Sequence, residues 1–195
     1  MIAFIFGICA YLLGSISSAI IISNVFGLSD PREVGSGNPG ATNVLRSGNK
    51  KAAALTLLGD MLKGFLPVIV ARILTDSDVV LAFTAIGAFL GHLYPLYYGF
   101  NGGKGVATAI GIFAGINIYI FIIMTITWLV TAKLFKMSSL ASLTSAGVAL
   151  LASFFTPSLP IIGASFVIVA LLFLKHRDNI NRIRAGNESK IGDKA

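Results

Sequence analysis

The side chains in this sequence that could bind a phosphate group lie in three short polar segments. Residues 35–46 read GSGNPGATNVLR and end in Arg46, and residues 91–108 carry Lys104 within GGKG. Residues 175–189 read KHRDNINRIRAGNES. Arginine holds phosphate through two parallel N–H bonds, and glycine lets a backbone approach a ligand closely. The composition of the three segments therefore predicts binding sites for anions.

The first segment combines neutral donors with one charge. Ser36, Asn38, Thr42 and Asn43 can donate hydrogen bonds, and Arg46 can clamp a phosphate. The alternative for this segment is an N-cap box that starts an interfacial helix with a surface arginine.

In the second segment, Gly102, Gly103 and Gly105 surround Lys104, and an apolar helix follows. Free N–H groups and the positive end of that helix predict an anion site. The segment is not a Walker loop, because Tyr98 stands where that pattern requires glycine and Gly105 where it requires Ser or Thr. A plain turn with one lysine remains the alternative.

The third segment places His176 and Asn179 three residues apart, hence on one helical face, and Arg182 continues that face. A basic tail after a membrane span would explain the arginines alone, but neither the histidine nor the asparagines. Near the other segments, Ser139 and Ser142 open an apolar run, where they either cap a helix or contact substrate.

The composition indicates that these segments are joined by membrane-spanning helices. Hydrophobic residues make up 55% of the 195 residues and charged residues 12%, against roughly a quarter charged in soluble domains. The net charge of +7 is then a property of the loops, not a sign of nucleic-acid binding. The single cysteine, Cys9, excludes an internal disulfide and a cysteine zinc site, and we expect it to be buried.

Apolar runs predict an all-α integral membrane protein, a single domain over residues 1–195 with about seven transmembrane helices; five or six are the fallbacks. Residues 106–135 are long for one helix, and Gly115 to Asn117 offer a turn that divides them. No Lys or Arg precedes the first apolar core, so we expect a retained helix and not a signal peptide. The runs are 2–27, 52–74, 79–100, 106–117, 118–135, 138–156 and 159–174.

Charge predicts the orientation of these helices. With the N-terminus outside, the outside turns hold Asp76 and Asp78, with Arg72 at their edge, and the C-terminus and all three polar segments face the cytoplasm. The cations on the cytoplasmic side are Arg32, Arg46, Lys50, Lys51, Lys104, Lys133, Lys136, Lys175, Arg177, Arg182, Arg184, Lys190 and Lys194.

Two polar features lie inside apolar runs. Asp60 and Lys63 are spaced i,i+3 and are expected to form a structural ion pair, although charges within a span often mark function. His92, in GHLYP, is expected to make a hydrogen bond at a helix end.

The three segments together, GSGNPGATNVLR, GHLYPLYYGFNGGKGVATAIG and HRDNINRIRAGNE, resemble the bacterial membrane glycerol-3-phosphate acyltransferases that use acyl phosphate. The resemblance covers essentially the whole chain. It implies transfer of a fatty acyl group from a long-chain acyl phosphate to the 1-hydroxyl of sn-glycerol 3-phosphate, giving lysophosphatidic acid and phosphate for phospholipid synthesis. It also implies seven helices in the bacterial cytoplasmic (inner) membrane and a site that faces the cytoplasm.

The same resemblance assigns the site residues, without metal or cofactor. His176, Ser36 and Lys104 are candidates for catalysis; Asn101 departs from the basic residue that is common before GGKG. Besides the bilayer and both substrates, a candidate partner is the upstream enzyme that forms acyl phosphate. The predicted substrate-binding residues are Ser36, Asn38, Asn43, Arg46, Gly102, Gly103, Lys104, Gly105, Thr108, Ser142, His176, Asn179, Arg182 and Glu188.

Two other functions fit the sequence less well. A transporter for a phosphorylated metabolite needs a midplane site, whereas the polar groups gather on one side. A membrane scaffold leaves the first two segments unexplained. The pattern His-x4-Asp of acyltransferases that use CoA or carrier protein does not occur, since Asn181 and Tyr97 follow the two histidines at that distance. The hydroxyl proton can pass to His176 or to the donor phosphate, and we favour the phosphate.

Overall fold

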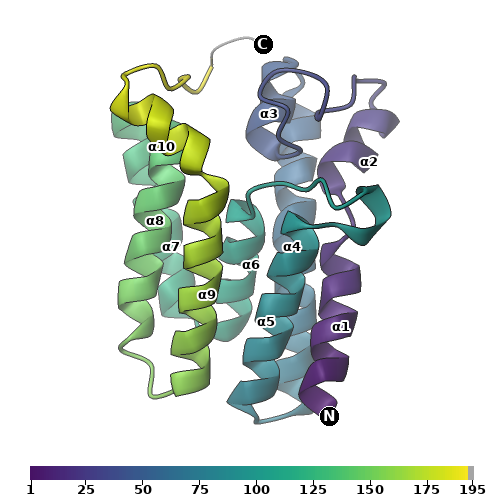
Figure 1. Cartoon of the computed structure of the whole chain (residues 1–195), viewed down its shortest axis with the longest axis vertical. Helices are drawn as coiled ribbons and strands as arrows, with labels where there is room; N and C mark the ends of the chain where they lie inside the picture. The colour runs from purple at the N-terminus through teal and green to yellow at the C-terminus, as the bar shows by residue number, and fades with distance from the viewer. Residues whose placement is uncertain (193–195) are drawn as a thin grey trace.

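The computed structural model describes residues 1–192, which form an all-helical bundle (Figure 1). Lys194, one of the predicted cytoplasmic cations, lies outside the described residues. The helices are α1 (Ile2–Gly14), α2 (Ser18–Val25), α3 (Ala41–Arg46), α4 (Lys50–Leu74), α5 (Asp78–Leu93), a 3-10 turn η1 (Leu96–Tyr98), α6 (Val106–Ile116), α7 (Ile118–Phe135), α8 (Ser138–Ser153), α9 (Leu159–Lys175) and α10 (Arg177–Arg184).

The predicted division of residues 106–135 into two helices is confirmed. The Asn117 side chain accepts hydrogen bonds from the first N–H groups of α7 and caps that helix. At the end of α6, Arg72 of α4 donates to the carbonyls of Gly115 and Ile116, at 3.1 and 2.8 Å. Both helix ends therefore have partners for backbone groups that a bilayer could not satisfy.

Four helical stretches of the described residues are long and apolar enough to cross a membrane, namely residues 2–25, 50–74, 78–98 and 118–135. A fifth is obtained when α9 and α10, which meet at an angle of 58°, are taken as one. The apolar helices α6 and α8 are shorter, with 11 and 16 residues. The prediction of an all-α integral membrane protein is confirmed, whereas seven crossings and the orientation stay predictions.

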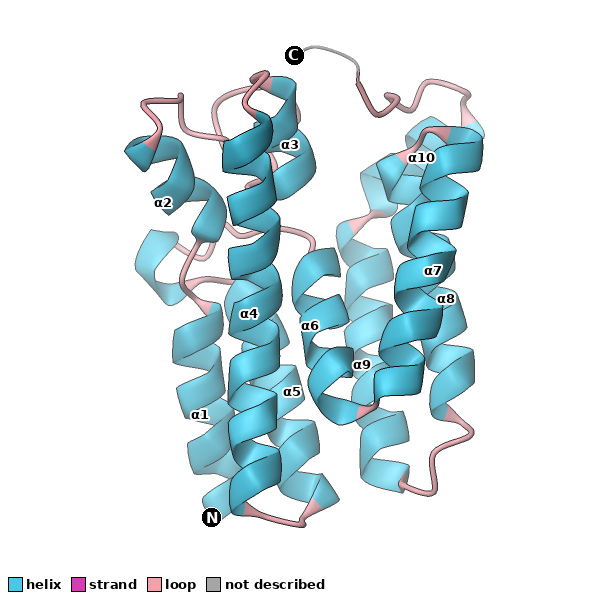
Figure 2. Cartoon of the chain, turned by 180° about the vertical axis from the view of Figure 1, so that it is seen from behind, coloured by secondary structure: helices cyan, strands magenta, loops and turns pink. Residues whose placement is uncertain are grey.

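Close contacts between α4 and α6 hold the middle of the bundle together. A Cβ atom at Gly111 of α6 would lie 2.0 Å from the carbonyl oxygen of Met61, and one at Gly64 of α4 would lie 2.3 Å from that of Thr108. The hydrophobic effect does not drive helices together in lipid, so their association depends on close van der Waals packing, which small residues such as glycine allow. In Figure 2, α6 stands between α4 and the group formed by α7, α8 and α9.

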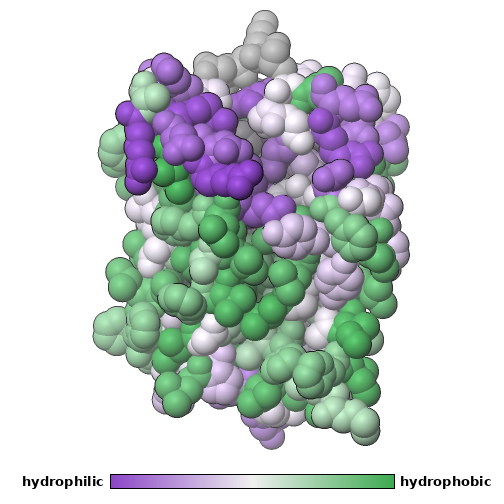
Figure 3. All heavy atoms as spheres, viewed as in Figure 1, coloured by the Kyte–Doolittle hydropathy of each residue, from purple (hydrophilic) through white to green (hydrophobic). Residues whose placement is uncertain are grey.

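The surface separates into two zones. Hydrophobic side chains cover most of the length of the bundle, and hydrophilic ones gather at the end that carries α3 and α10 (Figure 3). Exposed apolar side chains such as Phe4, Ile73 and Phe155 fit contact with lipid. Cys9 lies on this outer surface, so the expectation that it is buried was wrong: it points away from the neighbouring helices.

Candidate active site

The three polar segments meet at a cavity of about 290 Å³ at the hydrophilic end of the bundle. Helices α3 to α8 and α10, the loops before α3 and α6, the junction between α9 and α10, and the C-terminal residues 188–191 contribute to its wall. The predicted residues that line it are Ser36, Asn38, Asn43, Arg46, Lys104, Gly105, Ser142, His176, Asn179, Arg182 and Glu188.

The first segment is held in shape by one buried asparagine. The Asn43 Oδ1 accepts the N–H of Ser36 at 2.9 Å, and its Nδ2 donates to the carbonyls of Pro31 and Val34 at 2.7 and 3.0 Å. Its amide is therefore engaged in forming the loop. The N-cap residue of α3 is Gly40, which offers no side-chain hydrogen bond, so this segment does not form an N-cap box.

Arg46 joins the first segment to the third. It lies in the last turn of α3, and its Nη2 donates to the Ser189 Oγ at 2.5 Å. A guanidinium at this place can exchange a neutral hydroxyl for the oxygens of a phosphate. Ser189 ends the predicted third segment, and Lys190 and Ile191, just beyond it, line the same cavity.

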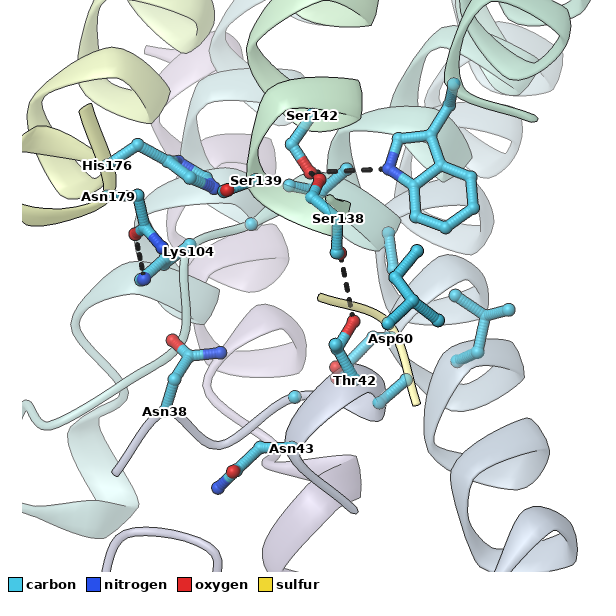
Figure 4. Close-up of a pocket in the computed structure, with 18 of the residues that line it drawn as sticks. Asn38, Thr42, Asn43, Asp60, Lys104, Ser138, Ser139, Ser142, His176 and Asn179 are labelled. Carbon is cyan, nitrogen blue, oxygen red and sulfur yellow. Dashed lines mark hydrogen bonds between the residues drawn. The ribbon is translucent and has the colours of Figure 1, made fainter. Parts of the chain in front are cut away.

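In the second segment, Gly105 has φ +84°, a conformation that favours glycine, and caps the N-terminus of α6. This turn directs Lys104 into the cavity, where its Nζ donates to the Oδ1 of Asn179. Figure 4 shows these two side chains facing each other.

The structure does not bring Gly102, Gly103 and Thr108 to the cavity. Both glycines pack against His92 of α5, so their missing side chains serve a contact within the protein and not the approach of a ligand. Thr108 is fully buried in α6.

The third segment bends where α9 meets α10, and His176 occupies the bend. Its Nδ1 lies 2.8 Å from the carbonyl oxygen of Leu172. A carbonyl can only accept, so Nδ1 carries the proton and a neutral ring leaves Nε2 as the acceptor. His176, Asn179 and Arg182 all line the cavity, as their spacing predicts.

Glu188 fixes the orientation of this helical face. Its carboxylate accepts from the Nδ2 of Asn179 at 2.6 Å and from the Nε of Arg182 at 2.8 Å. The Asn179 amide is thereby oriented with its oxygen toward Lys104. A chain of contacts thus runs from Lys104 through Asn179 and Glu188 to Arg182.

The charges around Arg46, Lys104 and Arg182 favour the binding of an anion in this part of the cavity. Burial lowers the pKa of Lys104, and the charges of Arg182 and Arg46 act in the same direction, against Glu188. Burial alone would raise the pKa of Glu188, but the hydrogen bonds from Asn179 and Arg182 outweigh it and hold this pKa below its usual value. Lining cations outnumber carboxylates: Arg46, Lys104, Arg182 and Lys190 against Asp60 and Glu188.

The serines at the start of α8 do not cap it, contrary to the capping interpretation. The N-cap residue is Met137, and the Ser142 Oγ donates to the carbonyl of Ser138 at 2.7 Å. The same Oγ accepts from the Nε1 of Trp128 at 3.3 Å, and Ser138 bonds Thr42 of α3 at 3.1 Å. Nothing in the sequence of α7 marked its tryptophan as part of the site.

The opposite side of the cavity is apolar. Leu57 and Met61 of α4, Ile110 of α6, and Phe121 and Leu129 of α7 form it. Leu57 and Leu129 are also exposed on the outside of the bundle, at 44% and 56% of their surface. The apolar wall is therefore continuous with the lipid-facing surface. Among residues 1–192, no group of three His, Cys, Asp or Glu side chains could hold a metal ion.

Comparisons with known proteins agree on one family. A family model described as glycerol-3-phosphate acyltransferase matches residues 4–186. The glycerol-3-phosphate acyltransferase of Francisella tularensis subsp. holarctica is 50% identical over 188 residues, covering 96% of this chain and 92% of the relative. That of Ralstonia nicotianae is 50% identical over 198 residues, covering 97% and 94%.

Two crystal structures of PlsY (YgiH), an integral membrane glycerol 3-phosphate acyltransferase, are similar over nearly the whole chain. The glycerol 3-phosphate form has a TM-score of 0.92 and 40% sequence identity, covering 97% of this chain and 96% of that one. The lysophosphatidic acid form has a TM-score of 0.89 at the same identity, covering 97% and 95%.

Proposed function

Because the chain belongs to the PlsY-type family of glycerol-3-phosphate acyltransferases, we propose that it moves a fatty acyl group from acyl phosphate to the 1-hydroxyl of sn-glycerol 3-phosphate. The products are lysophosphatidic acid and inorganic phosphate. The observation that carries this proposal is a single cavity with a cationic end and an apolar wall that reaches the lipid-facing surface. Similar solved structures, described as glycerol 3-phosphate and lysophosphatidic acid forms, support the acceptor and the product.

The cationic end suits the phosphates of both substrates. Arg46 and Lys104 supply charge from the first two segments, and Ser36, Asn38 and Asn179 supply neutral hydrogen-bonding groups beside them. Hydrogen bonds between a charged group and phosphate are the strong ones in such sites. Two phosphates held together place the acceptor hydroxyl next to the activated acyl carbon.

The apolar wall suits the acyl chain of the donor. A long chain would lie along α4, α6 and α7, with its phosphate at the cationic end and its tail toward the bilayer. The short helix α6 packs between the other two and supplies Ile110 to this wall. The donor would then enter from lipid and the acceptor from water.

The transfer itself is a direct exchange of bonds. The 1-hydroxyl oxygen attacks the acyl carbon, a new C–O bond forms, and the C–O bond to the donor phosphate breaks. We assign the hydroxyl proton to the departing phosphate, with Nε2 of His176 orienting the hydroxyl. Lys104 is near this ring, and a neighbouring cation opposes the imidazolium that a general base must become.

The proposed orientation places the cavity on the cytoplasmic side, with seven crossings and the N-terminus outside. The loop between α4 and α5, which holds Asp76, and the segment after α10, which holds Asn187, lie at opposite ends of the bundle (Figure 1), so a cysteine is placed at each in a Cys9→Ala background. An impermeant thiol reagent should label Asp76→Cys in intact cells, and Asn187→Cys only after permeabilisation. The reverse pattern would overturn the orientation and leave the proposed reaction standing.

The donor is tested directly with purified protein. We expect phosphate release and lysophosphatidic acid with palmitoyl phosphate, unchanged by a chelator, and no turnover with palmitoyl-CoA. Turnover with the thioester and none with acyl phosphate would contradict the proposed donor. Whether the enzyme that makes acyl phosphate also binds this protein is a separate proposal, tested by co-purification of the two.

A further inference from the structure

A buried cluster of ionisable side chains borders the cavity within α4 and α5. The Oδ1 of Asp60 lies 2.9 Å from the Nζ of Lys63 and 3.8 Å from the Nδ1 of His92. Asp60 and His92 are 3% and 6% exposed, and both line the cavity. The ion pair predicted from the i,i+3 spacing is therefore confirmed, and the imidazole ring of His92 lies beside it. Ionisable groups inside a membrane protein are costly and commonly functional.

Within the cluster, Lys63 has partners for its charge, whereas the His92 ring has a nitrogen that is unpaired in the described part of the chain. The Asp60 carboxylate compensates the charge of Lys63, whose Nζ also donates to the carbonyl of Ile16 at 2.7 Å. The Nδ1 of His92 makes no hydrogen bond within residues 1–192, whereas the backbone carbonyl of His92 accepts one from the N–H of Gly103. A carboxylate near Nδ1 favours the tautomer that carries its proton there, which leaves Nε2 as an acceptor.

The opposite edge of the His92 ring lies against the glycine segment. A Cβ atom at Gly103 would lie 2.3 Å from the Nε2 of His92, and one at Gly102 would lie 2.1 Å from the His92 carbonyl oxygen. The N–H of Gly103 donates to that same carbonyl at 3.2 Å. Both the ring and the backbone of His92 therefore hold the two residues that precede Lys104.

We propose that Asp60 and His92 are positioning residues: the charge of the Asp60 carboxylate, 3.8 Å from Nδ1, orients the His92 ring, and His92 holds residues 102–104 so that Lys104 reaches the anion site. This inference rests on the proposed function, because it concerns the same site. It explains why residues 102 and 103 are glycines although neither lines the cavity. It also gives the buried charge pair of α4 a purpose beyond holding helices together.

A double-mutant cycle tests the contact between the ring and the segment. Gly103→Ala should raise the KM for glycerol 3-phosphate by about tenfold, with kcat changed by less than about threefold. In a His92→Ala background the same change should raise KM by less than about threefold, because residues in contact are not additive. Gly147→Ala, whose new Cβ would meet nothing within 4 Å, is the matched control and should leave KM unchanged.

A second cycle tests Asp60. Asp60→Asn alone would leave Lys63 buried without its partner, so we pair it with Lys63→Met. Asp60→Asn together with Lys63→Met should raise the KM for glycerol 3-phosphate by about threefold or more when His92 is present. In a His92→Ala background the same two changes should leave this KM unchanged. A merely structural role would instead lower thermal stability and kcat together and leave KM in place.

The outcomes separate this inference from the proposed function. Active wild-type protein with additive effects in both cycles would overturn the inference alone. Wild-type protein without turnover on palmitoyl phosphate would contradict the proposed function. The positioning of Lys104 is then measured by the affinity for inorganic phosphate, which Gly103→Ala should weaken about tenfold and weaken far less with His92→Ala. If Gly103→Ala weakened phosphate binding equally with His92 and with His92→Ala, the inference would also be overturned.

Discussion

Replacing Arg46 with lysine separates the geometry of the anion site from its charge. The arginine reaches the cavity from the last turn of α3, with its Nη2 directed at Ser189 and its fork beside the second and third segments. Lysine keeps the positive charge but offers a single ammonium group in place of two parallel donors. The change therefore removes one charged hydrogen bond to phosphate and preserves the long-range field.

The size of the effect follows from that one bond. A hydrogen bond to a charged group contributes about 1.5–3 kcal/mol, and every 1.36 kcal/mol corresponds to about tenfold in rate. We therefore expect kcat/KM for glycerol 3-phosphate to fall about 10- to 150-fold in Arg46→Lys. The matched control is Arg32→Lys, because Arg32 is paired with Asp30 outside the main cavity. A surface ion pair contributes little, so we expect a change of less than about twofold.

The measurement is phosphate release from palmitoyl phosphate by purified protein, with each substrate varied in turn. A loss confined to the glycerol 3-phosphate series would assign Arg46 to the acceptor phosphate, and a loss confined to the other series would assign it to the donor. Equal kcat/KM values for Arg46→Lys and the wild type in both series would refute the role of the fork.

Three further predictions concern other parts of the molecule. Because burial lowers the pKa of Lys104, this side chain loses its charge at a lower pH than an ordinary lysine, and the KM for glycerol 3-phosphate should rise as the pH passes that point. Lys104→Arg should move this rise in KM to higher pH. A rise that stays at the same pH would contradict the role of Lys104 in binding phosphate. Gly111→Ala, which places a Cβ 2.0 Å from the Met61 carbonyl, should destabilise the protein by about 1–3 kcal/mol in thermal unfolding, and an unchanged midpoint would show that α4 and α6 adjust freely. His176→Gln, which keeps a hydrogen-bonding tip, should retain about tenfold more activity than His176→Ala and keep the acidic limb of the pH–rate profile; equal losses together with a missing limb would make His176 the general base.

Local chemistry explains what could be predicted from the sequence. The turn at Asn117 and the Asp60–Lys63 spacing are local properties, and both appear in the structure as expected. The apolar run 2–27, in contrast, forms two helices, α1 and α2, instead of one. The face shared by His176, Asn179 and Arg182 follows from helical periodicity. The three polar segments could be placed at one end because charge and span count allow few other arrangements.

What could not be predicted depends on contacts between distant segments. The partner of the glycines at 102 and 103 is His92, a contact that only the packing of the loop on α5 reveals. Trp128 sits in an apolar helix with no periodic signal and still reaches Ser142. Cys9 was misplaced because a residue in an apolar run can face lipid as well as the protein core, and composition does not distinguish the two.

In the proposed mechanism, one cavity transfers the acyl group directly between two bound phosphate compounds. Rapid quench of purified protein with palmitoyl phosphate and glycerol 3-phosphate tests it most directly, with phosphate, lysophosphatidic acid and protein-bound acyl groups measured in the same samples. We expect phosphate and lysophosphatidic acid to appear together in equal amounts, with no phosphate burst when glycerol 3-phosphate is omitted. A burst equal to the enzyme concentration, with an acylated protein seen by mass spectrometry, would contradict this mechanism.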